Sequence, residues 1–142
     1  MSQLWFGEVS LDTIKELNSN TLGQNLGIEF TELAPDYLVA TMPVDHRTKQ
    51  PFGLLHGGAS VALAETMGSV ATWLAVDRSK FIGVGVEINA NHLAMVTQGY
   101  VRAECRAIRC SGRLHVWEIK LYDQGGQLCC ICRFTCMVVP KR

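Results

Sequence analysis

One stretch of the chain combines residue types that can act on a carbonyl group: Gln50, the run His56-Gly57-Gly58, and Glu65. From Gly57 onward the residues predict one long helix. An unpaired N–H at a helix start, with the positive end of the helix dipole behind it, stabilises negative charge developing on a carbonyl oxygen. Two glycines at that point leave no side chain to obstruct a substrate. The helix start therefore suits an oxygen atom that gains negative charge, and a carboxylate lies farther along the same helix.

Glu65 is the only ionised side chain between His56 and Trp73, in a helix that is apolar nearly all the way round. Such a helix is expected to be buried, and burying an unpartnered carboxylate costs free energy. At helical spacing the stripe of Glu65 also carries small or polar residues, namely Gly58, Ala62, Ser69 and Thr72. Two interpretations stay open: Glu65 reaches solvent at a helix edge, or it has a chemical role.

The elements around this stretch predict an α+β fold. The predicted order is a helix over 10–17, strands over 26–33 and 37–42, a long helix from 57, and strands over 81–91, 100–109, 114–123 and 127–139. Tight turns at 111–112 and 124–126 join the last three strands as antiparallel hairpins. Strands that follow one another after a helix favour an antiparallel sheet. Five or six strands are wide enough to wrap one helix of about 18 residues.

The length of 142 residues fits a single domain spanning 1–142. The formal net charge is zero, so nucleic acid is not expected as a partner. No apolar run reaches the roughly 18 residues of a membrane span, and no basic stretch followed by an apolar core opens the chain. We expect a cytoplasmic protein that binds no membrane and hides surplus apolar surface in an oligomer interface.

Six cysteines lie at 105, 110, 129, 130, 132 and 136. The last four could suggest a metal cluster, but no second ligand pair follows at finger-like spacing. The period of two along a strand places Cys130, Cys132 and Cys136 on one face, in line with Phe134. We expect reduced, small core residues rather than a metal site or a disulfide framework.

Several motifs resemble those of the hotdog-fold acyl-CoA thioesterases. They are Arg47-Thr-x-Gln50-Pro-Phe-Gly, His56-Gly57-Gly58-Ala-Ser60, Leu63-Ala-Glu65 and Glu87-Ile-Asn-Ala-Asn-His92. An isolated His-Gly-Gly is a weak signal, whereas the run 47–69 as a whole is a strong one. The chain is similar to the small single-domain group of phenylacetate-pathway and hydroxybenzoyl-CoA thioesterases. Within that group it resembles the menaquinone-pathway dihydroxynaphthoyl-CoA thioesterase and the enterobactin proofreading thioesterase.

The resemblance implies a hotdog fold and a role for each motif residue. The carboxylate of Glu65 would act as nucleophile or general base, and the backbone N–H of Gly57 would bind the thioester oxygen. Gln50 and His56 would orient the carbonyl or the attacking water. Further substrate contacts are implied for Ser69, near the acyl group, and for Gly85, His92, Ser111, Gly112 and Arg113. Of these, His92 and the 111–113 hairpin would hold the nucleotide part of coenzyme A. Beyond coenzyme A itself, which is part of the substrate, the resemblance implies no cofactor or metal.

The implied assembly is a homodimer whose two sheets join, with two dimers forming a homotetramer. Glu65 follows Gly57 by eight residues, which is about 12 Å by helix rise. One carbonyl is not easily reached by both groups from a single chain. The active site is therefore expected to pair Gly57 of one subunit with Glu65 of its neighbour.

The substrate and the kinetic role of the carboxylate stay open. An aromatic acyl-CoA is implied by resemblance only, and an acyl or aryl carrier protein is an alternative donor. A domain that senses acyl-CoA without hydrolysing it has no need of Glu65, so this residue favours an enzyme. A hotdog dehydratase would carry an Asp and His pair that the chain lacks. A nucleophile and a general base need the same carboxylate in the same place.

Overall fold

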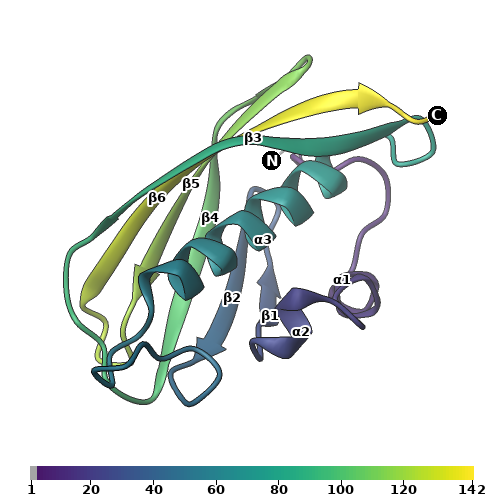
Figure 1. The fold of residues 1–142 in the computed structure, drawn as a ribbon. Coiled ribbons are helices and arrows are strands. Elements are labelled where there is room, and N and C mark those ends of the chain that lie inside the picture. Colours follow the sequence, from purple (N-terminus) through teal and green to yellow (C-terminus); the bar gives the residue numbers. More distant parts are fainter. Residues whose placement is uncertain (1–2) are drawn as a thin grey trace.

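A computed structural model, which describes residues 3–142, shows one long helix held against a curved antiparallel sheet (Figure 1). The helices are α1 (Leu11–Leu17), α2 (Leu22–Asn25) and α3 (Gly57–Ala75). The strands are β1 (Glu29–Leu33), β2 (Tyr37–Pro43), β3 (Phe81–His92), β4 (Tyr100–Ser111), β5 (Leu114–Tyr122) and β6 (Leu128–Pro140). The predicted α+β architecture, with up to six strands around one central helix, is confirmed.

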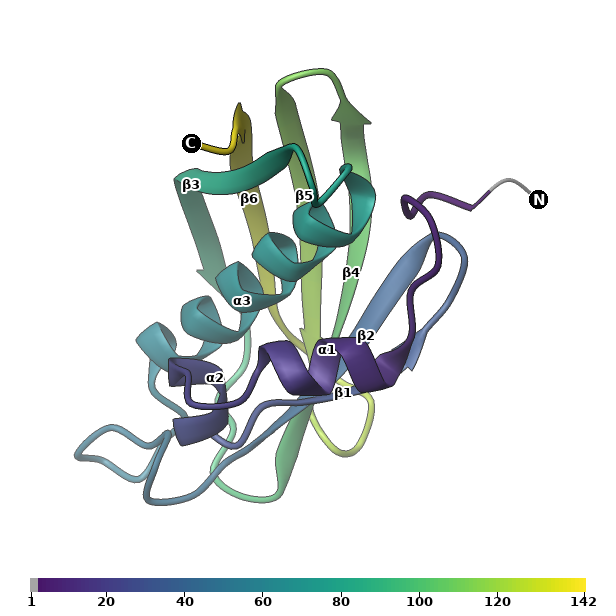
Figure 2. The same ribbon diagram turned by 90° about the vertical axis from the view of Figure 1, so that its right-hand side faces the viewer.

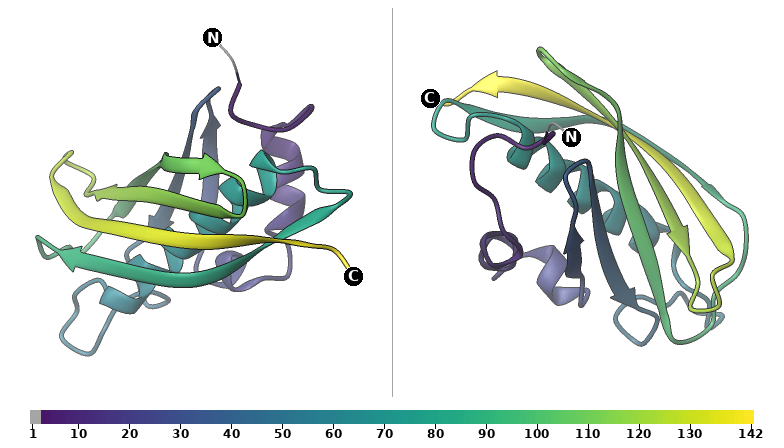
Figure 3. Two further views of the ribbon diagram at one scale, coloured as in Figure 1. Left: turned by 90° about the horizontal axis from the view of Figure 1, so that it is seen from above. Right: turned by 180° about the vertical axis from the view of Figure 1, so that it is seen from behind.

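The sheet has the strand order β1-β2-β4-β5-β6-β3, and all neighbouring strands are antiparallel. β3 follows α3 in the chain and returns to the far edge of the sheet, beside β6 (Figure 3, left). Its outer edge has no neighbour within residues 3–142. Ile82, Val84 and Val86 on this strand are 40%, 47% and 57% exposed. A long apolar edge strand of this kind is a template for pairing with another chain.

The short helix α2 is not predicted from the sequence. Thr21 caps it, because its side chain accepts a hydrogen bond from the N–H of Gln24. Its four residues are too few for helical periodicity to show. The first strand accordingly begins at Glu29, later than the predicted residue 26. α2 packs against α3 on the side that the sheet leaves open, and α1 lies next to α2 and packs against β1 (Figure 2).

The core lies between α3 and the concave face of the sheet. The helix contributes the fully buried side chains of Leu63, Met67 and Leu74, and β5 contributes Trp117. Cys130, Cys132, Phe134 and Cys136 are buried along β6, which confirms the predicted face of that strand. No helix within residues 3–142 is long and apolar enough to cross a membrane.

Thr72 lies at helical spacing from Glu65 and Ser69 on α3, yet it does not share their exposure. Its side chain is fully buried, and its Oγ1 accepts a hydrogen bond of 2.8 Å from Nε1 of Trp117. The reason is that β3 crosses this part of α3. A methyl group at Gly83 would lie 2.7 Å from Cγ2 of Thr72.

Replacing Thr72 by valine is expected to lower the free energy of unfolding by about 1–3 kcal/mol, because the buried indole N–H of Trp117 loses its acceptor. Urea denaturation of the wild type and the variant measures this difference. Thr66→Val is the control, since Thr66 is half-buried on the same helix and forms no side-chain hydrogen bond within residues 3–142. Equal losses in both variants would show that the bond to Trp117 contributes nothing.

Candidate functional site

The start of α3 presents a backbone N–H that has no internal partner. His56 is the N-cap residue, and its Nδ1 accepts a hydrogen bond of 2.8 Å from the N–H of Gly58. The N–H of Gly57 donates to no acceptor within residues 3–142. Since Nδ1 of the His56 ring is an acceptor, the proton of the neutral ring lies on Nε2. The helix start therefore offers two N–H donors to a ligand, one from the backbone and one from an imidazole.

The loop before α3 is held in place by contacts among its own residues. Asp45 pairs with Arg47, whose Nη2 lies 2.7 Å from Oδ2, and this contact lowers the pKa of Asp45 to about 2. Thr48 is buried and donates from Oγ1 to the carbonyl of Pro43 at 2.7 Å. The N–H of His56 in turn donates to the carbonyl of Thr48 at 2.8 Å. These bonds fix the approach of the chain to the helix start.

Gln50 lies in the turn that precedes His56. Its Oε1 accepts hydrogen bonds from the N–H of Phe52 and, at 3.5 Å, from that of Leu54. Its backbone N–H donates to the carbonyl of Leu54 at 2.8 Å. The side-chain amide is therefore held through its oxygen. Its NH₂ group has no partner within the described chain and can donate to a carbonyl oxygen or a water molecule.

His92, at the end of β3, lies beside the same helix start. A methyl group at Gly57 would be 2.9 Å from Nε2 of His92. Nδ1 of the ring lies 3.6 Å from the sulfur of Cys130 on β6. Three of the predicted site residues, His56, Gly57 and His92, are therefore brought together by the fold of one chain.

Glu65 and Ser69 lie on the exposed side of α3, two and three turns beyond Gly57. The carboxylate reaches solvent at the helix edge, so within one chain it does not lose the free energy of hydration that burial would remove. It lies across the edge strand: a methyl group at Gly85 would be 2.9 Å from Oε1 of Glu65. The absence of a side chain at Gly85 thus lets the carboxylate approach β3. Glu65 forms no ion pair or hydrogen bond with residues 3–142, so it is available to a ligand.

A groove of about 280 Å³ opens beside Glu65, between α3 and the two short helices. The residues that line it are Leu17, Asn18, Thr21, Leu22, Gly23, Glu65, Thr66, Ser69 and Val70. The contribution of residues 17–23 cannot be read from the sequence, because it depends on how α1 and α2 pack against α3. The groove gives the carboxylate an apolar wall on one side.

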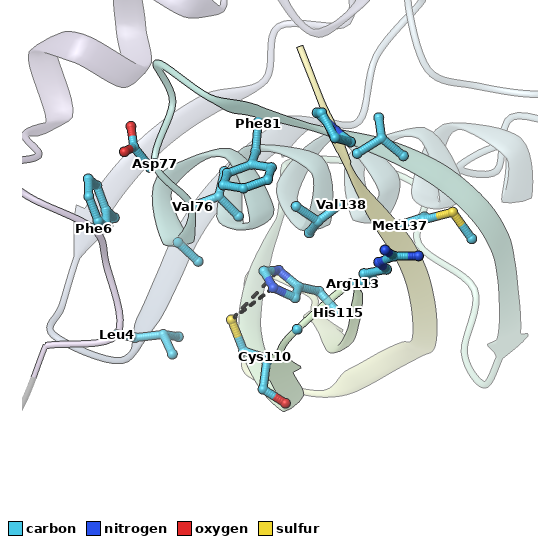
Figure 4. A pocket seen from close by; sticks show the side chains of 15 residues that line it. Leu4, Phe6, Val76, Asp77, Phe81, Cys110, Arg113, His115, Met137 and Val138 are labelled. Atoms are coloured by element: carbon cyan, nitrogen blue, oxygen red, sulfur yellow. Dashed lines mark hydrogen bonds between the residues drawn. The ribbon is translucent and has the colours of Figure 1, made fainter.

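The predicted hairpin residues Ser111, Gly112 and Arg113 lie at the other end of the molecule. They line a cavity of about 730 Å³ beside Ala75, the last residue of α3 (Figure 4). The ring of His115 lies in this cavity, 3.7 Å from the sulfur of Cys110, and burial lowers its pKa. The 19 residues of α3 separate this end from Gly57, a span of about 28 Å. One chain alone therefore does not bring the hairpin together with His92.

Comparisons with known proteins agree with the fold. Residues 52–130 match the family described as the thioesterase superfamily. The chain is 47% identical to the proofreading thioesterase EntH of Klebsiella pneumoniae, with 95% of this chain and 98% of the relative covered. It is 43% identical to the 1,4-dihydroxy-2-naphthoyl-CoA hydrolase of Escherichia coli, with 96% and 99% covered.

Solved structures extend the same relationship. A crystal structure of a mutant of the thioesterase PA1618 from Pseudomonas aeruginosa superposes with a TM-score of 0.95 at 47% identity, with 98% of this chain and all of that chain covered. The thioesterase HI1161 of Haemophilus influenzae superposes with a TM-score of 0.93 at 44% identity, with 97% and 96% covered. With a matching family signature, this sequence identity and this fold, the chain belongs to the thioesterase superfamily of thioester hydrolases and has their hotdog fold.

Proposed function

We propose that the protein hydrolyses acyl-CoA thioesters at sites shared between two subunits. The observation that carries this proposal is the unpartnered N–H of Gly57 at the start of α3, flanked by two imidazoles. In each site, the helix start of one subunit binds the thioester oxygen. Glu65 of the neighbouring subunit acts on the carbonyl carbon or on the attacking water.

The chemistry follows from where charge develops. Attack on the thioester carbon moves an electron pair onto the carbonyl oxygen, and the N–H of Gly57 with the dipole of α3 stabilises that charge. The C–S bond then breaks, coenzyme A leaves as a thiol, and water supplies the oxygen of the free acid. A carboxylate can either activate the water or form an acyl anhydride that water then cleaves. Both routes place Glu65 near the carbonyl carbon, whereas the N–H of Gly57 lies at the oxygen.

A second subunit is needed because α3 separates the two groups. The helix is continuous from Gly57 through Glu65, so their backbones are about 12 Å apart. The apolar edge of β3 is the surface that suits a two-fold partner. Two-fold symmetry reverses β3 in the partner. The end of β3 at His92, which lies beside Gly57 of α3, therefore points along the partner's strand, toward the partner's copy of Gly85 and Glu65.

Placing a charge on the edge of β3 is expected to disrupt the assembly and lower activity at least about tenfold, because like charges meet across the two-fold axis. Val86→Lys tests this by light scattering and thiol release. Ile108→Lys on β4 is a matched control, because Val86 and Ile108 are both 57% exposed. A Val86→Lys protein that is monomeric yet fully active would contradict a shared site.

The proposed acyl group is aromatic or otherwise largely apolar. The groove beside Glu65 has apolar walls from Leu17, Leu22 and Val70, which suit such a group by the hydrophobic effect. One relative is named for a dihydroxynaphthoyl thioester, which is aromatic. A carrier-protein thioester is the second candidate donor, because another relative is named a proofreading thioesterase.

Thiol release from a panel of donors tests the proposal. The panel contains benzoyl-CoA, a dihydroxynaphthoyl-CoA, short and long fatty acyl-CoAs, and an aryl-loaded carrier protein. We expect turnover with aryl thioesters, and the preferred donor separates coenzyme A from carrier protein. Binding of a donor without release of thiol would replace the proposed hydrolase by an acyl-CoA sensor.

A further inference from the structure

We propose that His92 donates a hydrogen bond from Nε2 to the thioester oxygen, and that Cys130 is a positioning residue that holds the ring for this role. The inference rests on the proposed function and deepens it. It assigns a further catalytic residue, and it gives His92 a place different from the nucleotide contact that the family resemblance implies.

The ring of His92 lies close to the helix start at Gly57. Its Nε2 lies next to Gly57, since a methyl group there would be only 2.9 Å from it. The N–H of Gly57 is the donor assigned to the thioester oxygen. An oxygen bound to that N–H is thus within reach of the His92 ring.

The thiol of Cys130 lies behind the ring of His92 and contacts it. Its sulfur is 3.6 Å from Nδ1 of His92 and 3.6 Å from the sulfur of Cys132. Cys130 and Cys132 are 1% and 0% exposed, so their own contact is shielded from water, whereas the ring of His92 is exposed. Either thiol can donate in the contact between the two sulfur atoms, and we assign the donor role to Cys132. The single proton of Cys130 is then left to point at Nδ1 of His92.

The tautomer of the ring follows from this relay. A neutral imidazole that accepts at Nδ1 carries its proton on Nε2. Cys130 therefore turns Nε2, the nitrogen beside Gly57, into a donor. Because a donor fixed before reaction needs no reorganisation as charge develops, such a contact favours the transition state. Without Cys130 the ring is free to rotate and to adopt the other tautomer, which presents a lone pair to the oxygen.

A truncated substrate separates the two roles of His92. An acyl N-acetylcysteamine thioester keeps the reacting carbonyl and lacks the nucleotide of coenzyme A. We expect His92→Ala to lower kcat at least about tenfold with both substrates, because the lost donor acts on the carbonyl. His92→Gln keeps an N–H near the position of Nε2 and is expected to recover part of the loss. A defect that is confined to the coenzyme A substrate and appears in KM would overturn the assignment and return His92 to the nucleotide.

A double-mutant cycle tests whether Cys130 acts through His92. Cys130→Ala is expected to lower kcat about three- to tenfold, because this factor corresponds to the free energy that one hydrogen bond contributes. Cys130→Ser keeps a donor and is expected to stay within about twofold of the wild type. In the His92→Ala background, Cys130→Ala should have no further effect on kcat, since the two residues form one unit. Equal losses from Cys130→Ala in both backgrounds would show that the thiol has only a packing role.

Cys105→Ala is the matched control for stability. Cys105 is also 0% exposed in the core, on β4, and forms no hydrogen bond through its thiol within residues 3–142. It is expected to destabilise the fold without changing kcat. Two outcomes separate this inference from the proposed function. If the wild-type protein hydrolyses none of the thioesters, the proposed function itself is rejected.

If the wild type hydrolyses them normally and the His92→Ala variant is equally active, only this inference is rejected.

Discussion

Replacing Glu65 by glutamine is expected to lower kcat at least about a hundredfold, with KM little changed, because the carboxylate acts only in the chemical step. The side chain lies exposed beside β3, and glutamine matches its size, so the variant should fold normally. Thiol release from the preferred aryl thioester measures the effect. The pre-steady-state time course adds mechanistic information, because a burst of thiol would point to an acyl-enzyme that accumulates before water cleaves it.

Glu16→Gln provides the control for the loss of one surface carboxylate. Glu16 is exposed on α1, next to Leu17 of the groove, and is assigned no chemical role. We expect its kcat to stay within about twofold of wild type. A Glu65→Gln enzyme that retains most of its kcat would remove this residue from the mechanism, whatever its effect on binding.

Replacing Gly57 by proline is expected to lower kcat about a hundred- to a thousandfold, which is the cost of one oxyanion donor. Proline removes the N–H, and it is tolerated at the first position of a helix. The extended backbone of His56, with φ −65° and ψ 129°, suits a residue that precedes proline. The variant should therefore fold and still bind substrate.

Gly57→Ala separates the N–H from the space around it. Both variants add a Cβ atom beside Nε2 of His92, but only proline removes the backbone donor. We expect the alanine variant to lose about tenfold or less, as the exposed ring of His92 can move aside. Comparable losses in the two variants would mean that crowding, rather than a missing hydrogen bond, is responsible.

Patterns within single elements predict most of the fold. The apolar helix from Gly57, the alternating face of β6 and the hairpin turns are local features, and each is found in the structure. Features that depend on packing between elements are not predicted. Whether Thr72 is buried depends on where β3 crosses α3, and α2 is too short to leave a periodic signal.

The candidate site is predictable only in part for the same reason. The motif around His56 places the unpartnered N–H of Gly57, since capping and helix start are local. The contacts of His92 cannot be predicted from the sequence, because they depend on how elements pack together. β3 ends beside the start of α3, and β6 brings Cys130 behind the ring. The apolar wall from residues 17–23 likewise depends on the docking of α1 and α2.

Mixing two inactive subunits tests the shared site most directly. Glu65→Gln and Gly57→Pro chains are refolded together in equal amounts, and thiol release is compared with each variant refolded alone. In mixed assemblies, an intact Gly57 from the first chain meets an intact Glu65 from the second. We expect about a quarter of wild-type activity, because random two-fold pairing makes one site in four complete. No recovery at any mixing ratio, with mixed assemblies demonstrated, would contradict a site built from Gly57 of one subunit and Glu65 of its neighbour.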